Sequence, residues 1–224
     1  MSKNYLKINQ EARTAELYIY GDLTQDNWWD GTVSAQSVAD QIHDMDVDLI
    51  QVHVDSYGGE VSEGWAIYSQ LVEHKAKVVT YADGFVASAA LYPFLAGDQR
   101  IASTLSGFFF HEVLSSAYGY ASDLRKAADD AEKLTDIGIS SFVERTSMEE
   151  NTVRELMAQE TWVTPDEAME YGLVTEIRKS AQAASPSQSA KAAIFARLKQ
   201  QAPPKKEDPI EEKPTGLARV LAGL

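Results

Sequence analysis

The chain has 224 residues, of which 44% are hydrophobic and 24% charged, a balance typical of a globular protein with a buried core. It has no cysteine, which excludes disulfides and a cysteine nucleophile and fits a cytoplasmic protein. The formal net charge of −14 argues against a nucleic-acid-binding surface. No apolar run approaches the length of a membrane span and the N-terminus does not resemble a signal peptide, so we expect no membrane partner.

The charge is unevenly distributed along the chain. Residues 180–224 carry seven Lys/Arg and four Asp/Glu, a net +3, which leaves −17 for residues 1–179. This C-terminal part begins with the low-complexity stretch "SAQAASPSQSA" and includes two short helix-forming pieces, "AKAAIFARLKQQ" and "TGLARVLAGL". We therefore predict one folded domain over 1–179, followed over 180–224 by a largely disordered linker with short docking helices.

Strands and helices alternate in the first half of the domain, after about a dozen residues that precede the first predicted strand. The predicted elements in chain order are a strand over 15–23, a helix over 32–45, a strand over 49–56, a helix over 61–74, and a strand over 76–84 that leads into an apolar helix.

The second half continues with two strands, near 99–103 and 107–113, and then with the longest helical pattern of the chain, over 120–146. This helix carries an approximate apolar stripe made of Leu124, Ala128, Ala131, Leu134, Ile137 and Phe142. A short helix over 149–158, a helix over 164–172 and a closing strand over 173–178 complete the domain. Alternating strands and helices predict an α/β fold with right-handed crossovers.

Ser88 stands among small residues in "YADGFVASAALYPFLAG", where the apolar helix begins. One interpretation is that Ser88 caps or packs a buried helix. The other is that Ser88 is a nucleophile at a helix N-terminus, where small neighbours leave room for a substrate carbonyl and the helix dipole favours an oxyanion.

A serine nucleophile needs a base, and the chain has four histidines. His43 and His74 fall at helix ends and are most simply solvated, while His53 falls inside a strand and is best read as a packed or edge residue. His111 ends the strand-like run "SGFFFHEV", at the end of a strand where ligands gather in open α/β sheets. No G-x-S-x-G motif occurs, so an α/β-hydrolase has no support.

The pair Gly58-Gly59 lies at another strand-to-helix junction, in "VDSYGGEVSEG". It fits a tight turn that requires positive φ, and it equally fits a backbone whose N–H groups approach a substrate oxyanion without side-chain obstruction. Two such junctions, one with Gly-Gly and one with Ser88, form a coherent set with His111.

Four segments of the chain resemble the Clp protease proteolytic subunit (ClpP) family, in the same order and at similar spacings over roughly residues 15–178. "VDSYGGEVSEGWAIYSQL" is similar to "NSPGG…G…IYDTM", and "ADGFVASAA" to "GQAASMGA". "FFFHEVLSSAYGYASDL" is similar to "MIHQPLGGYQGQATDI", and "ETWVTPDEAMEYGLVTEI" to "DRFLSAPEAVEYGLVDSI".

This resemblance implies a serine peptidase with a Ser-His-acid triad. Ser88 would be the nucleophile and His111 the general base and later acid, with the amides of Gly59 and Ala89 as oxyanion donors. The family's orienting aspartate is matched here by Glu160, one methylene longer, which fits the role or is simply a solvated residue before the next strand. The implied mechanism calls for no metal and no cofactor.

The resemblance also implies a ClpP/crotonase-type α/β spiral of β-β-α units, with a long handle-like helix, assembled as a homo-oligomer of stacked rings. The sequence has no P-loop motif, so we expect it to hydrolyse no ATP itself. The short N-terminal segment and the tail fit most closely the ATP-independent head maturation (prohead) proteases of tailed bacteriophages. Such an enzyme would cleave capsid or scaffold proteins in the host cytoplasm, within assembling heads.

Two alternatives remain. One is a ClpP proper that works with an ATP-driven unfoldase. The other is an inactive scaffold or docking protein that retains the fold, an interpretation that Glu160 and the tail support.

Overall fold

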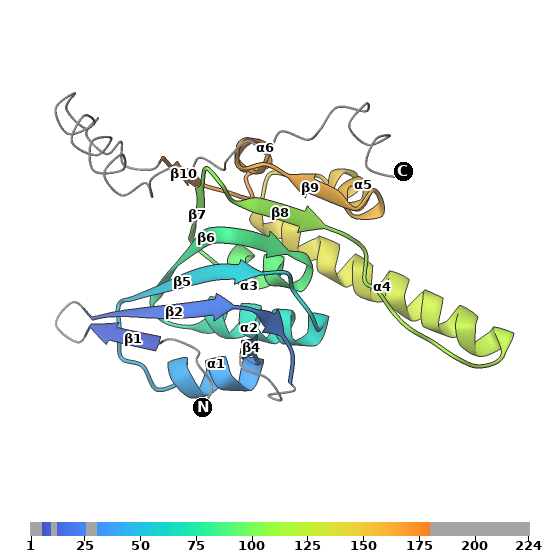
Figure 1. Cartoon of the computed structure of the whole chain (residues 1–224), viewed down its shortest axis with the longest axis horizontal. Helices are drawn as coiled ribbons and strands as arrows, with labels where there is room; N and C mark the ends of the chain where they lie inside the picture. The colour runs from blue at the N-terminus through green and yellow to red at the C-terminus, as the bar shows by residue number, and fades with distance from the viewer. Residues whose placement is uncertain (1–5, 10–12, 26–30, 180–224) are drawn as a thin grey trace, which may run out of the picture. The chain divides into compact units, whose positions relative to one another are not determined.

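The computed structural model describes residues 6–9, 13–25 and 31–179 (Figure 1). The predicted tail, 180–224, lies outside the described residues, so the proposed boundary after Lys179 stays a prediction. Across the described ranges, no helix is both long and apolar enough to cross a membrane.

The strands in chain order are β1 (Leu6–Asn9), β2 (Thr14–Tyr20), β3 (Asp22–Leu23), β4 (Thr32–Val33), β5 (Leu49–Ser56), β6 (Lys77–Ala87), β7 (Gln99–Ser103), β8 (Gly107–Phe110), β9 (Thr161–Val163) and β10 (Glu176–Arg178). The helices are α1 (Ala35–Ile42), α2 (Val61–Glu73), the 3₁₀ turn η1 (Ser88–Ala90), α3 (Leu91–Leu95), α4 (Ala121–Arg145), α5 (Glu150–Ala158) and α6 (Pro165–Glu170).

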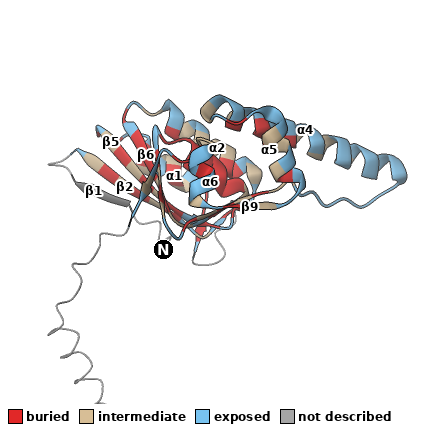
Figure 2. Cartoon of the chain, turned by 90° about the horizontal axis from the view of Figure 1, so that it is seen from above, coloured by how far each residue is buried: buried red, intermediate tan, exposed pale blue. Residues whose placement is uncertain are grey.

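The main sheet has the strand order β1-β2-β5-β6-β7-β10, with β8 paired to β6 and β9 paired to β8. The pairs from β2 to β10 along this path are parallel, an arrangement typical of the α/β fold that the alternation of strands and helices predicted. Alternate residues of β2 and β5 are buried, and helices cover the face to which they point (Figure 2). The core therefore lies between the sheet and its helices.

Strand β6 divides its pairing between two partners. Its first part, Val79–Ala82, pairs with β7, and its last residues, from Phe85 to Ala87, pair with β8. Between them, Gly84 lies so close to Asp55 that a Cβ at Gly84 would come 2.4 Å from the Asp55 carboxylate. Asp55 in turn accepts a hydrogen bond from the amide of Phe85 at 3.0 Å. This crowded junction directs the end of β6 toward the start of η1.

Helix α4 is confirmed, but most of its predicted apolar stripe is not buried. Phe142 is fully buried, whereas Leu124 and Ile137 are 47% and 56% exposed. The helix contacts the core through Phe142 together with three residues outside the predicted stripe, Thr135, Gly138 and Ile139. Figure 1 shows the reason, because the N-terminal half of α4 extends beyond the sheet and its other helices.

The expectation that the first strand begins near residue 15 is wrong. Strand β1 precedes it and pairs antiparallel with β2 at the sheet edge. Its four residues, "LKIN", are too few to establish an alternating pattern, so local sequence carries little signal for this strand.

Candidate active site

The ends of two neighbouring strands bring Ser88 and His111 together. Because β6 and β8 are parallel and pair Ala87 with Phe109, the residues that follow each strand emerge at the same edge of the sheet. The Nε2 atom of His111 lies 2.6 Å from the Oγ atom of Ser88. This is hydrogen-bond distance, and the hydroxyl donates when Nε2 carries no proton.

The backbone of Ser88 has a φ of +55°, in the left-handed region that residues other than glycine rarely adopt. Such a conformation costs about 1–3 kcal/mol and persists where the surrounding structure enforces it, often at functional sites. The hydroxyl of Ser88 bonds to His111 and does not cap the helix that follows. The geometry therefore favours the nucleophile interpretation over the capping one.

Ser88 and His111 line a cavity of about 430 Å³. Its apolar part includes Leu91 and Met157, and its polar part includes Gly59 and the first amides of η1. The ring of Phe109 lies 5.7 Å from that of His111, so an apolar neighbour helps to hold the imidazole, as the strand pattern indicated.

Gly58 and Gly59 allow the loop after β5 to approach Ser88. Their φ angles are +98° and +139°, so the predicted positive-φ turn is confirmed. A Cβ on Gly58 would lie 2.8 Å from the Cβ of Ser88, and one on Gly59 would lie 2.2 Å from the carbonyl oxygen of Leu23. A side chain at Gly58 would push the loop away from Ser88, and one at Gly59 would disrupt the pairing of the loop with Leu23.

The amide of Gly59 is directed away from β3. Leu23 donates to the carbonyl of Gly58 at 2.8 Å and accepts from the amide of Glu60 at 2.8 Å, as in a parallel bridge. In this pattern the intervening residue points its own N–H group to the opposite side. Ala89 lies in the first turn of η1, where backbone amides have no hydrogen-bond acceptor within the helix. Both residues line the cavity beside Ser88.

Glu160 is not joined to His111. Phe110 pairs with Thr161 in the antiparallel β8–β9 ladder, so one further step of the register would place Glu160 opposite His111. However, Glu160 has a φ of +49° and is exposed, and within the described ranges no hydrogen bond links its carboxylate to the imidazole. The structure thus brings together Ser88, His111, Gly59 and Ala89 but leaves the role of Glu160 open.

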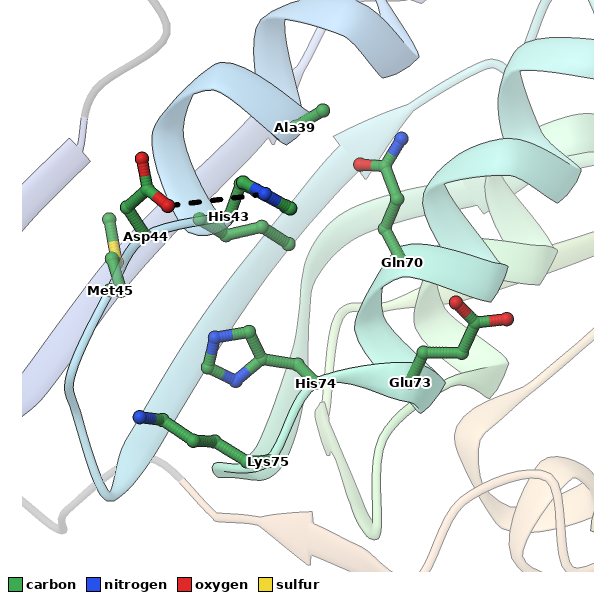
Figure 3. Close-up of a pocket in the computed structure, with 9 residues that line it drawn as sticks. Ala39, His43, Asp44, Met45, Gln70, Glu73, His74 and Lys75 are labelled. Carbon is green, nitrogen blue, oxygen red and sulfur yellow. Dashed lines mark ion pairs between the residues drawn. The ribbon is translucent and has the colours of Figure 1, made fainter.

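A different hollow, of about 530 Å³, lies between the C-terminal ends of α1 and α2 (Figure 3). His43 is solvated there as predicted, with a side chain 85% exposed and 3.9 Å from Asp44. His74 is half-buried, contrary to prediction, because its Nδ1 accepts the amide of Ala76 at 3.0 Å. In the described part of the chain, no three His, Cys, Asp or Glu residues form a candidate metal site. No serine lines this hollow, so the cavity at Ser88 is the better candidate.

His53 is packed in its strand, as expected, within a polar and aromatic cluster that sequence reasoning did not foresee. Its ring stacks between those of Tyr18 and Tyr81, each 4.7 Å away, and its Nδ1 lies 2.6 Å from Asp83. Burial raises the pKa of Asp83, but hydrogen bonds from His53 and Tyr20 and the charges of His53 and Arg178 together lower it by more, so this pKa lies below its ordinary value. The sequence signal for this cluster was that its residues alternate with apolar ones in β2, β5 and β6. Their partial burial becomes evident only when the strands are assembled into the sheet.

Comparison with known proteins gives one consistent result. A family model described as Clp protease matches residues 12–181. The "ATP-dependent Clp protease proteolytic subunit 2" of Treponema denticola is 32% identical over 134 residues, which are 58% of this chain and 66% of that protein. The "ATP-dependent Clp protease proteolytic subunit 3" of Rhizobium meliloti is 29% identical over 170 residues, 74% of this chain and 84% of that protein. Among solved structures, a ClpP1 mutant from Listeria monocytogenes superposes with a TM-score of 0.63 at 23% identity, covering 76% of this chain and 93% of the other.

Proposed function

The chain belongs to the Clp protease family and has the ClpP-like α/β fold that its sequence predicted, and from this premise we propose that it is a serine endopeptidase. The observation that carries the proposal is the Ser88–His111 contact of 2.6 Å inside a cavity. The family match supports the reaction class, and the geometry supports the assignment of these two residues.

In the proposed mechanism, His111 removes the proton of Ser88 as Oγ attacks the carbonyl carbon of the scissile peptide. The amides of Gly59 and Ala89 donate to the oxyanion that develops. His111 then gives its proton to the leaving amine, and an acyl-enzyme forms on Ser88. Water, activated by the same imidazole, hydrolyses the ester and restores the serine.

We assign Glu160 a positioning role toward His111. The β8–β9 register supports it, because Glu160 directly precedes Thr161, the partner of Phe110. The carboxylate of Glu160 would have to move to reach Nδ1, because within the described residues no hydrogen bond joins it to His111. A solvated Glu160 remains the alternative, and Glu160→Gln distinguishes the two, since an orienting carboxylate lowers kcat when lost while a solvated one has little effect.

The biological role that we propose is ATP-independent cleavage of capsid or scaffold proteins during phage head maturation, by a homo-oligomer of stacked rings. The acidic body joined to a basic tail supports this role, because a separate tail suits docking to an assembling partner. The exposed Leu124 and Ile137 on α4 support assembly. Partnership with an ATP-driven unfoldase is the second candidate, favoured by the names of the curated relatives.

A fluorophosphonate probe tests the reaction class directly. The wild-type protein should be labelled on Ser88, while Ser88→Ala should not be labelled. Ser140→Ala, which removes an exposed hydroxyl on α4, should be labelled like the wild type. Absence of labelling in the folded wild-type protein would favour the inactive scaffold instead.

Hydrolysis of protein substrates then separates the two biological roles. Purified capsid or scaffold protein from the same genome should be cleaved without ATP. Degradation of a folded protein only in the presence of a bacterial unfoldase and ATP would establish the second candidate.

A further inference from the structure

Two carboxylates line the cavity that holds Ser88 and His111. Glu60 directly follows Gly59 at the N-terminus of α2, and Glu112 directly follows His111 after β8. The cavity lining contains no lysine and no arginine. The two sides of the cavity, one built from the loop after β5 and one from the segment after β8, therefore each add a negative charge.

Both carboxylates are accessible to a ligand. Glu60 is exposed and lines the cavity, and one of its oxygens accepts a hydrogen bond from the hydroxyl of Thr24 at 2.7 Å, which restrains the side chain. Glu112 is also exposed, and it forms no hydrogen bond or ion pair with any other residue that the structure describes. One carboxylate is thus held in place and the other is available for a partner.

We infer that the site prefers peptide substrates that carry lysine or arginine beside the scissile bond and disfavours those with acidic residues there. This inference rests on the proposed peptidase function. A basic side chain at such a position would lay its methylene groups along the neighbouring apolar surface and place its charged head at a carboxylate. Val113 and Leu114 follow Glu112 in the cavity lining and supply such a surface.

The expected preference is modest, because both carboxylates are exposed to solvent. Charge pairs of this kind change a binding constant about two- to fivefold each, and salt screens them. With two carboxylates, a lysine peptide should be hydrolysed about four- to twenty-five-fold faster in kcat/KM than its neutral counterpart at low salt. An acidic peptide should be slower than the neutral one, since the like charges repel.

The test uses a series of fluorogenic peptides with one apolar residue before the cut and with lysine, glutamine or glutamate at each neighbouring position in turn. The measured quantity is the ratio of kcat/KM for the lysine peptide to that for the glutamine peptide, in low and in high NaCl. Glu60→Gln and Glu112→Gln should each lower this ratio about two- to fivefold. Taking the ratio within each variant cancels any effect on the catalytic pair itself.

Glu73→Gln provides the matched control, because Glu73 is exposed at the opposite end of the same helix as Glu60, about 20 Å away along α2. It should leave the ratio unchanged. Equal hydrolysis of lysine, glutamine and glutamate peptides by the wild-type protein would overturn the inference and leave the peptidase proposal standing. A lysine preference that persists unchanged in the Glu60→Gln, Glu112→Gln double variant would also overturn it. No hydrolysis of any peptide, with no labelling of Ser88, would overturn both.

Discussion

Ser88 combines a left-handed backbone, a short contact to an imidazole and a place beside two glycines. Each of these features has a cost or a steric requirement of its own. Their coincidence at one serine is difficult to explain as helix packing, which would need neither the backbone strain nor the base.

Ser88→Ala should lower peptide hydrolysis by at least about a thousandfold, because it removes the attacking oxygen. His111→Ala should cause a similar loss, and the double variant should be hardly slower than either single variant, since both residues serve one chemical unit. Steady-state rates and circular dichroism spectra of all three variants would check this. If the rate losses of the two single variants multiplied in the double variant, the two residues would act in separate steps.

Asp83→Asn should lower the free energy of unfolding at pH 7 by about 1–3 kcal/mol, because it weakens a partly buried network with His53, Tyr20 and Arg178. The pKa of Asp83 is depressed in the folded state, so its contribution is full above the unfolded pKa of about 4 and is lost as the pH falls through the folded value. The gap between variant and wild type in urea denaturation should therefore narrow as the pH falls below about 4. Glu132→Gln, at an exposed position of α4, should show no such gap.

For individual residues, the sequence best predicted the candidate site where the backbone conformation restricts the residue type. Gly58, Gly59 and Ser88 stand out because few residue types suit their φ angles and the close approach between them. The role of Glu160 could not be predicted from the sequence in the same way. Its side-chain direction depends on a single left-handed residue between α5 and β9, and residue types alone do not reveal that conformation.

Among the elements, α4 contacts the core through a glycine. A Cβ at Gly138 would come 2.2 Å from the hydroxyl oxygen of Tyr92, and Tyr92 also lines the cavity at Ser88. The packing of α4 and the shape of the candidate site therefore depend on the same tyrosine.

Gly138→Ala should destabilise the protein by about 1–3 kcal/mol, although alanine is the better helix former, because the added methyl group displaces Tyr92 or the helix. It should also raise KM for small peptides, since Tyr92 is part of the cavity. Ser140→Ala, two residues along the same helix and exposed, serves as the control and should change the unfolding free energy by less than about 0.5 kcal/mol. If Gly138→Ala leaves the free energy of unfolding unchanged, α4 shifts to accommodate the added methyl group without a loss of stability.

The exposed apolar residues of α4 lead to a second prediction at this scale. Leu124→Asp combined with Ile137→Asp should reduce the particle mass measured by light scattering, because both side chains are exposed on the helix that we propose as an assembly surface. Leu105→Asp, which alters an exposed leucine outside α4, should leave the mass unchanged. An unaltered mass of the α4 variant would place the assembly surface elsewhere.

The elements show which parts of a fold a sequence pattern reports. The strands flanked by helices were predicted because each long enough run has one clear period. β1 was missed because four residues carry no period, and the buried face of α4 was misassigned because a helix that leaves the body has apolar residues outside the core. Only the tertiary arrangement distinguishes an apolar stripe that faces the core from one that faces solvent.

For the molecule as a whole, the last described strand, β10, ends at Arg178 beside β7. Arg178 contacts Asp83 at 3.2 Å, so the end of the domain is anchored to the sheet. The sheet pairings and the active-site contacts named above all lie within the residues before position 180.

A chain truncated after Lys179 should therefore hydrolyse small peptides at the full wild-type rate. It should lose co-assembly with capsid protein if the tail is the docking segment that we propose. Sedimentation of the mixture with capsid protein and peptide hydrolysis would be measured on the same preparation. Loss of peptide hydrolysis on truncation would show that the tail belongs to the enzymatic domain and that the boundary is misplaced.

The divided pairing of β6 has a consequence for the protein during its synthesis. Ser88 directly follows β6, which pairs with β5, β7 and β8. Strand β8 pairs in turn with β9, which ends at Val163. Contacts between residues so far apart in the sequence form late in folding, because closing the long intervening loop costs conformational entropy. We therefore expect a nascent chain that is still attached to the ribosome to lack the Ser88–His111 contact until nearly the whole domain has emerged. The proposed peptidase would therefore be inactive while its chain is being translated.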